Sequence, residues 1–332
     1  MLEKAINNPP EVSVVIPVFN GTRYLGACLD SAVQQSFPDL EIIIVDDASS
    51  DDVTRLVAPY QASDCRVKFY QNHKNIGLAE NWNRCIRYAS GNWIKFLFQD
   101  DRLDPNCVEI MLALSDNKPF VVCERNFIIE KKTDQEQRNF YQSKVSRLSD
   151  ELPIPTFIRP ERFTAYIEEK GIGQNFIGEP PSVLVKRSLL SRYGLFNQNL
   201  LHLCDLEFWT RIATNEGIQF LPEKLAYFRV HSQSASTNHH EFHKFRLTYI
   251  DRMILLHDYL YLPVYKSLRD ELQDRMDLAA LLRKTVANTI RYLKKNLNPD
   301  ERTLFSKLLV SFPAIRQFMP REDPYDMVEK ND

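Results

Sequence analysis

Short apolar runs alternate with segments of helical periodicity through the first 123 residues. The runs at 12–19, 40–45 and 93–98 are nearly continuous, as in parallel strands that are buried on both faces. Shorter runs with strand character occur at 66–70 and 120–123. Helical spacing predicts helices from Thr22 to a break at Ser36, from about Asp52 to Tyr60, from Gly77 to Ser90 and from Pro105 to about Ser115. This alternation predicts an α/β fold with a doubly wound, mainly parallel sheet, in which residues 1–123 form a nucleotide-binding half.

The regular pattern is interrupted after residue 123. Residues 124–159 are charged and contain prolines, so we expect a loop or a mobile flap there. The elements expected after it are a glycine-rich bend at 171–181, a strand at 182–186, a helix from Ser188, a helix over 205–212 that ends near Gly217, and extended segments at 220–230.

Long helical periodicity with few glycines begins beyond His239. We predict a helical appendage over 240–320, with a break at 296–300 and a loose tail at 322–332. The expected domains are therefore 11–238 and 239–332. Apolar residues beside charges in the appendage suggest an exposed amphipathic face, which a partner chain or a lipid surface would cover. These residues are Leu255, Leu256, Tyr259 and Leu262.

Composition narrows the class of protein. With 332 residues, 44% of them hydrophobic, the chain can fill a large core. A formal charge of −2 gives no general attraction to nucleic acid. The six cysteines form no CxxC pair, which favours reduced, buried thiols. Without a signal-peptide core or an apolar stretch of about 20 residues, we expect a cytoplasmic protein, or one that is peripheral at the inner membrane face.

The central apolar run ends on Asp100 and Asp101. Ligands of open α/β sheets collect beyond the carboxyl ends of strands, and paired carboxylates suit Mg²⁺ or Mn²⁺ holding phosphates. The alternative is a solvated turn before the next helix, because Asp is also favoured in turns and caps. No GxGxxG or P-loop follows the first strand, so phosphates would depend on a metal bound to acids.

Five short motifs follow one another along the chain. They are Val15-Ile16-Pro17-Val18-Phe19-Asn20, Val45-Asp46-Asp47-Ala48-Ser49-Ser50-Asp51, Asn75-Ile76-Gly77-Leu78, Gln99-Asp100-Asp101 and Asp205-Leu206-Glu207-Phe208-Trp209. In order and spacing they resemble the family 2 glycosyltransferases with a GT-A fold, over about residues 11 to 236. The resemblance implies a GT-A nucleotide-binding core with a mixed, mainly parallel sheet, and the C-terminal helical appendage predicted above would follow this core.

The resemblance implies a nucleotide-sugar site at the first strand ends. The residues that it places beside the donor are Pro17, Val18, Phe19, Asn20, Asp46, Asp47, Asn75, Gly77, Asn83 and Asp100. Asp47 would accept from the base ring N–H, while Asp46 supports the turn. Phe19 could instead be a core aromatic. Trp82 stands where relatives often carry an Arg before the second Asn, with Arg84 and Arg87 as weak substitutes for a cationic contact.

The same resemblance implies a Mn²⁺ or Mg²⁺ ion. Asp101 is the expected metal ligand, and Asp100 a ribose or outer partner. Gln99 departs from the common Asp-x-Asp form, which puts the strict requirement for metal in doubt. His231 stands where several relatives complete the metal or diphosphate site, although a structural histidine is the alternative. His239, His240 and His243 are interpreted as a solvated linker rather than a metal site.

Asp205 occupies the position of the family's catalytic base. An inverting transfer needs one carboxylate to remove the proton of the acceptor hydroxyl as its oxygen attacks. Asp205 could instead be an acid that only starts a helix. Glu207 is the weaker base candidate and is expected to shape the acceptor site.

We therefore expect an inverting, metal-dependent glycosyltransferase that uses a nucleoside-diphosphate sugar, with UDP or dTDP favoured. The acceptor would be a sugar or a lipid-linked molecule in polysaccharide, glycolipid or glycoconjugate synthesis. A homodimer through the C-terminal helices and a peripheral membrane contact are further expectations, and no nucleic-acid partner is expected. The rival hypothesis is a catalytically inactive nucleotide-sugar-binding or scaffold protein of the same fold. A nucleotidyltransferase would need a glycine-rich phosphate loop, which the N-terminal region lacks.

Overall fold

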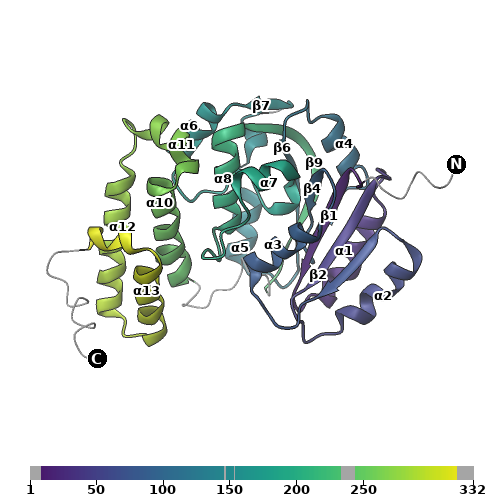
Figure 1. The fold of residues 1–332 in the computed structure, drawn as a ribbon, viewed down its shortest axis with the longest axis horizontal. Helices are drawn as coiled ribbons and strands as arrows, with labels where there is room; N and C mark the ends of the chain where they lie inside the picture. Colours follow the sequence, from purple (N-terminus) through teal and green to yellow (C-terminus); the bar gives the residue numbers. More distant parts are fainter. Residues whose placement is uncertain (1–8, 146, 153, 233–243, 320–332) are drawn as a thin grey trace. The chain divides into compact units, whose positions relative to one another are not determined.

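The computed structural model describes residues 9–145, 147–152, 154–232 and 244–319. They fall into two compact units (Figure 1). The first takes in the described residues up to Gln198 and again from Cys204, and the second takes in Asn199–Leu203 and the described residues from 244 on.

A single sheet organises the first unit. Its strands are β1 (Val12–Val18), β2 (Leu40–Asp46), β3 (Val67–Gln71), β4 (Trp93–Phe96), β5 (Arg102–Leu103), β6 (Phe120–Ile129), β7 (Thr156–Ile158), β8 (Val183–Lys186) and β9 (Ile218–Val230). Their order among the described residues is β3-β2-β1-β4-β8-β6-β9-β5, with β7 paired to β9. The first four strands run parallel, whereas β8 is antiparallel to both β4 and β6. The predicted mixed, mainly parallel α/β sheet is confirmed.

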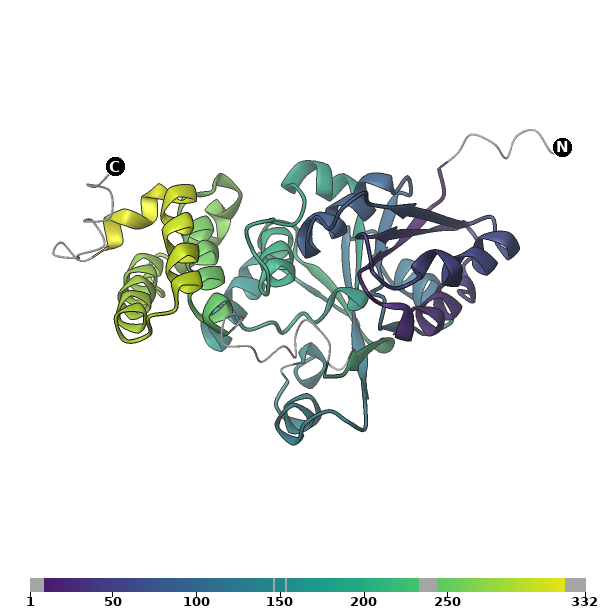
Figure 2. The same ribbon diagram turned by 90° about the horizontal axis from the view of Figure 1, so that it is seen from below.

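Helices cover both faces of this sheet (Figure 2). They are α1 (Thr22–Val33), α2 (Val53–Ser63), α3 (Leu78–Tyr88), α4 (Cys107–Ala113), α5 (Gln135–Ser143), α6 (Pro160–Lys170), α7 (Arg187–Tyr193) and α8 (Cys204–Glu216). All seven positions of β1 and of β2 are buried, since apolar residues occupy both faces of these strands. Alternate residues of β1 pack with α1, α2 and α4. On the other face, Phe96 of β4 meets Trp209 of α8 at 5.6 Å between ring centroids.

The expectation of a loop or flap over residues 124–159 is wrong. β6 continues to Ile129, and α5, a 3₁₀ turn η1 (Leu148–Asp150) and β7 follow it. The second half of β6 pairs with β9, from Arg125 opposite Ala226 to Ile129 opposite Val230. A partner strand about a hundred residues away supplies the hydrogen bonds, so the local pattern of charges gave no sign of this strand.

The second unit is helical. It consists of a π-helical turn η4 (Arg246–Asp251), α10 (Arg252–Tyr261), a 3₁₀ turn η5 (Pro263–Tyr265), α11 (Lys266–Leu272), α12 (Leu278–Lys295), α13 (Pro299–Ser311) and a 3₁₀ segment η6 (Pro313–Phe318). α12 and α13 are separated at the predicted break. Within the described residues, no helix combines the length and the apolar character that crossing a membrane requires. His239, His240 and His243, and the tail at 322–332, lie outside the described residues.

The exposed amphipathic face expected in this unit is not present as predicted. Leu255 and Leu256 are fully buried and Tyr259 is 2% exposed, whereas Leu262 is 38% exposed. α10 packs against α12, and this contact inside the unit uses the apolar positions that suggested a partner or lipid surface. All six cysteines are free, and only Cys65 is exposed.

Candidate active site

Three parallel strands end side by side and place the predicted residues at one edge of the sheet. Val18 at the end of β1 is in register with Asp46 at the end of β2, and β4 lies on the other side of β1. Gln99 ties the segment after β4 to the end of β1. Its Oε1 accepts from the Phe19 N–H at 2.8 Å, and its Nε2 donates to the Phe19 carbonyl at 3.2 Å. The residue that departs from the Asp-x-Asp form therefore has a backbone contact of its own.

Asp46 and Asp47 are both buried and both hydrogen-bonded through two oxygens. Asp46 accepts from the Ser49 N–H at 3.2 Å and from Gln71 Nε2 at 2.8 Å. The three donors to Asp47 are Asn72 Nδ2 at 2.8 Å, the Ile76 N–H at 2.9 Å and the Gly77 N–H at 3.0 Å. Asp47 thus holds the turn that leads into α3.

The end of β1 offers one large exposed ring. Pro17 and Val18 are buried inside the strand, while Phe19 just beyond it is 47% exposed, which excludes the core alternative for this ring. Asn20 has a positive φ of 51°, and its Oδ1 accepts from the Ser50 N–H at 2.8 Å. The ring of Phe19 is free to contact a flat ligand such as a base.

The asparagines around α3 have different surroundings. Asn75 is exposed, and Gly77 takes a φ of 89°, which favours glycine. Asn83 is 1% exposed, and its amide exchanges two hydrogen bonds of 2.9 Å with the backbone of Phe196. This pairing gives Asn83 a structural contact. Trp82 packs against Phe98, with ring centroids 4.4 Å apart.

The two weak substitutes for the missing arginine differ in their contacts. Arg87 Nη1 donates to Glu80 at 2.7 Å. The guanidinium of Arg84 lies over the ring of Tyr88, 6.0 Å from its centroid, a contact that does not use its N–H groups. Arg87 is therefore engaged, and a cationic contact from α3 would fall to Arg84.

Asp100, Asp101 and His231 lie together where β4 and β9 end. His231 Nε2 lies 2.9 Å from Asp100 Oδ2, and the ring of Tyr24 packs against His231 at 4.7 Å. Asp101 is fully buried: Oδ1 accepts from the Arg229 N–H at 2.8 Å, and Oδ2 has no hydrogen-bond partner among the residues that the structure describes. Burial, with the charge of Asp100 next, raises the pKa of Asp101 well above its usual value.

These donors fit a hard divalent cation. Carboxylate oxygens with one imidazole are a ligand set that Mn²⁺ accepts, and a buried oxygen without a partner is a group that a ligand would satisfy. In the part of the chain that the structure describes, no three acid, His or Cys side chains are already arranged around a metal position. The hydrogen bond between His231 and Asp100 would have to give way to bring both side chains onto an ion.

Asp205 is the second residue of α8 and is partly buried. Oδ1 accepts from the Leu206 N–H at 2.7 Å, and Asn175 Nδ2 donates to Oδ2 at 3.3 Å. Burial is the largest cause that raises the pKa of Asp205 from 3.8 to about 7, and the negative charge of Glu179 adds to it. A carboxyl group with this pKa is suited to take up a proton near neutral pH.

Glu207 lies in different surroundings two residues later. It is 1% exposed, and Arg211 Nη2 donates to Oε2 at 2.9 Å. Arg211 also donates to the carbonyls of Tyr193 and Leu195. These contacts favour a structural role for Glu207 over an acceptor contact.

Three residues near the site were missed by the sequence analysis: Arg125, Asn175 and Glu179. Arg125 follows the register shift in β6, and the other two belong to the glycine-rich bend. Glu179 Oε2 lies 2.5 Å from Arg125 Nε. Tertiary contacts bring that bend close to Asp205. In the sequence, the glycines of the bend were the only sign that it belongs to the site.

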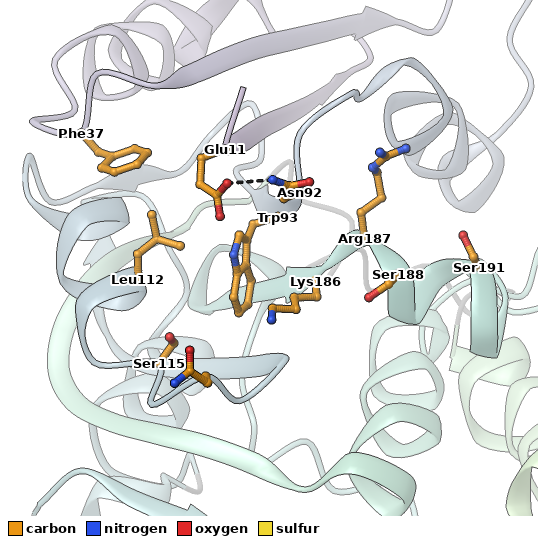
Figure 3. A pocket seen from close by; sticks show the side chains of 11 residues that line it. Glu11, Phe37, Asn92, Trp93, Leu112, Ser115, Lys186, Arg187, Ser188 and Ser191 are labelled. Carbon is orange, nitrogen blue, oxygen red and sulfur yellow. Dashed lines mark hydrogen bonds between the residues drawn. The ribbon is translucent and has the colours of Figure 1, made fainter. Parts of the chain in front are cut away.

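A cavity of about 730 Å³ lies elsewhere, near the starts of β1 and β4 (Figure 3). Glu11, Trp93, Lys186 and Arg187 are among the residues that line it, and Figure 3 shows the Trp93 ring beside the Lys186 side chain. None of the predicted site residues lines this cavity. The candidate active site is therefore at the opposite, carboxyl end of the parallel strands.

The family of the chain follows from a match to a family model over residues 13–193. Residues 13–193, more than half of the 332, match the family described as Glycosyl transferase family 2. The chain belongs to glycosyl transferase family 2. An uncharacterized glycosyltransferase of Rickettsia typhi is 28% identical to this family 2 chain over 238 residues, which are 69% of this chain and 67% of that protein.

Solved structures support the fold of this family 2 protein. TarS 1–349 of S. aureus, in complex with UDP-GlcNAc, matches with a TM-score of 0.59 at 14% identity, over 97% of this chain and 93% of that one. The mannosyltransferase PcManGT of Pyrobaculum calidifontis, in complex with GDP-Man and Mn²⁺, matches with a TM-score of 0.53 at 17% identity, over 94% and 84%. The predicted GT-A fold with C-terminal helices is confirmed.

Proposed function

We propose that this family 2 glycosyltransferase is an inverting enzyme that transfers a sugar from a nucleoside-diphosphate sugar to an acceptor hydroxyl. One observation carries the proposal: Asp205, at the start of α8, is a partly buried carboxyl group bonded by Asn175 of the glycine-rich bend, and burial raises its pKa to about 7. An acid that only started a helix at the surface would be expected to titrate near its usual value.

In the proposed reaction Asp205 is the general base. It takes the proton of the acceptor hydroxyl while the acceptor oxygen forms a bond to the anomeric carbon. The bond from that carbon to the diphosphate oxygen breaks on the opposite face, so the configuration inverts. A pKa near the working pH keeps a large fraction of the carboxylate ionised and still basic enough to accept the proton.

The end of β1 and the turn before α3 would bind the nucleotide. The exposed ring of Phe19 offers a flat surface for the base. Asp47 already accepts three internal hydrogen bonds, and a carboxylate has about four acceptor positions, so one remains for a base N–H. A pyrimidine ring N–H, as in UDP or dTDP, fits this acceptor. Asn20, Asn75 and Gly77 line the same turns in this proposal.

Asp101, Asp100 and His231 would hold a Mn²⁺ or Mg²⁺ ion, as the donor set and the free oxygen of Asp101 suggest. When bound, such an ion neutralises the charge that develops on the departing diphosphate. If Asp100 is not a ligand of the ion, its side chain would face the ribose instead.

For the second substrate, we propose an acceptor that is a sugar or a lipid-linked molecule.

A thermal-shift screen tests this function. UDP, dTDP, GDP and their common sugar conjugates would be added with and without Mn²⁺, because a ligand that binds only the native state raises the melting temperature. We expect UDP or dTDP compounds to give the largest shifts, and these shifts to depend on Mn²⁺. EDTA with the same ligands serves as the control. The proposal is contradicted if no nucleotide or nucleotide sugar shifts the melting temperature.

A further inference from the structure

We propose that Glu179, held in place by Arg125, is a sugar-binding residue: its carboxylate accepts a hydrogen bond from a hydroxyl group of the transferred sugar. This inference rests on the proposed function and assigns a residue outside the family motifs found in the sequence. It identifies the class of ligand as a neutral, polyhydroxylated ring.

The carboxylate of Glu179 is fixed by a buried cation. Arg125 is 2% exposed, and its Nε lies 2.5 Å from Glu179 Oε2. The Glu179 side chain itself is 18% exposed, so one side of the carboxylate remains open. The buried arginine fixes the orientation of the carboxylate, so that its accessible side can face a bound ligand.

The backbone of the bend is shaped to permit this contact. Gly178 has a φ of 111°, and a Cβ atom at this position would lie 2.9 Å from the Arg125 guanidinium carbon. Only glycine therefore lets the chain pass so close to Arg125 while it presents the next residue. Lys95, fully buried, donates at 2.5 Å to the Pro181 carbonyl and anchors the other end of the segment.

The same bend contacts the proposed base. Asn175 accepts from the Gly178 N–H at 2.9 Å and donates to the Gly178 carbonyl at 3.1 Å. The amide of Asn175 also donates to Asp205 Oδ2 at 3.3 Å. One side chain thus joins the residue before Glu179 to Asp205, so the geometry of the bend and of the base are linked.

Two buried polar atoms of the site have no hydrogen-bond partner among the described residues, Asp101 Oδ2 and Arg125 Nη2. Native proteins leave few such groups, and a ligand is a common reason for those that remain.

Glu179 is also close to the proposed base. Asn175 bonds both Gly178 and Asp205, and the charge of Glu179 contributes, after burial, to the raised pKa of Asp205. The transferred sugar must lie beside the base, because its anomeric carbon is the atom that the acceptor attacks. A carboxylate repels the diphosphate but accepts hydrogen bonds from sugar hydroxyls, so the sugar is the part of the donor that it fits.

Isothermal titration separates the sugar from the nucleotide. UDP and a panel of UDP-glucose, UDP-galactose and UDP-GlcNAc would be titrated, with Mn²⁺, into the wild-type protein and Glu179→Gln. We expect the affinity for UDP to stay within about twofold. The affinity for the nucleotide sugar that binds the wild type best should fall about tenfold, the usual worth of one hydrogen bond to a charged group.

Two further variants keep the test decisive. Glu179→Asp preserves the charge beside Arg125 but shortens the side chain by one methylene group. It should therefore lose the same sugar-dependent affinity. This variant keeps the test valid if Glu179→Gln folds poorly. Glu169→Gln removes an acid from a surface ion pair with Arg162 and should bind both ligands as the wild type does. Equal affinity of wild type and Glu179→Asp for the nucleotide sugar overturns the assignment. If the wild type binds neither this panel nor the dTDP and GDP compounds of the thermal-shift screen, the proposed function itself fails, and the assignment fails with it.

Discussion

Two aspartate pairs end the strands on either side of β1, and they differ in what surrounds them. Asp46 and Asp47, after β2, use both carboxylate oxygens for bonds to the turns beside them. Asp101, after β4, has one bonded oxygen and one buried oxygen with no partner. The same dipeptide therefore mainly fixes the backbone at one strand end, with one acceptor position of Asp47 left for the base, and leaves a whole carboxylate oxygen for a ligand at the other.

The difference comes from the chain that meets each pair. The turn at 72–77 brings a side-chain amide and two backbone N–H groups to Asp47. In the described part of the chain, Asp101 receives a single N–H, from Arg229 in β9. A carboxylate with donors on both oxygens mainly supports structure, with one position of Asp47 left for the base, and one with an oxygen free of donors can hold a metal ion. The acids of α8 differ in another way: Asp205 is partly exposed, whereas Glu207 is buried against Arg211.

The largest effect is expected from the pair of acids in α8. Asp205→Asn keeps the shape of the side chain but cannot take a proton. Transfer should therefore fall by about 10² to 10⁴, while donor affinity stays near that of the wild type. Glu207→Gln is the matched control, and it should lose stability rather than turnover because Glu207 pairs with Arg211. Slow hydrolysis of the donor sugar can serve as the assay. Wild-type turnover in Asp205→Asn would assign the base to another residue.

A substantial loss of stability is expected at the end of β2. Asp47→Ala leaves the Ile76 and Gly77 N–H groups and the Asn72 amide without their acceptor, which should cost about 2 to 4 kcal/mol of unfolding free energy. Asp52→Ala removes an acid that caps α2 at the surface and should cost about 1 kcal/mol or less. Urea denaturation measures both. Equal losses would show that Asp47 is not the organiser of its turn.

Much of this contrast could not be read from the sequence. The apolar runs identified β1, β2 and β4, and the motifs identified both aspartate pairs. The sequence could not show which carboxylate oxygens would be filled, because the donors come from segments up to 128 residues away, as with Arg229 and Asp101. Glu179 was missed for the same reason: its partner Arg125 lies in a stretch that was expected to be a loop.

A smaller effect concerns stability and pH. Because the pKa of Asp205 is about 7 in the folded protein and near 3.8 when unfolded, the folded state binds the proton more tightly. The wild type should therefore lose stability as pH rises from about 4 through 7. Asp205→Asn, which never ionises, should be more stable than the wild type by about 1 kcal/mol or more at pH 8, and the gain should vanish near pH 4. Denaturation at the two pH values measures this difference, and a gain independent of pH would contradict the raised pKa.

The most direct test of the contrast between the two aspartate pairs is the affinity of UDP, measured by isothermal titration with and without Mn²⁺. Three proteins would be compared: wild type, Asp101→Asn and Asp46→Asn. We expect Asp101→Asn to fold normally and to lose the Mn²⁺-dependent part of the affinity, a drop of about tenfold or more. Asp46→Asn should lower stability and still show tighter binding with Mn²⁺ than without it. Equal Mn²⁺-dependent affinity in wild type and Asp101→Asn would contradict the account.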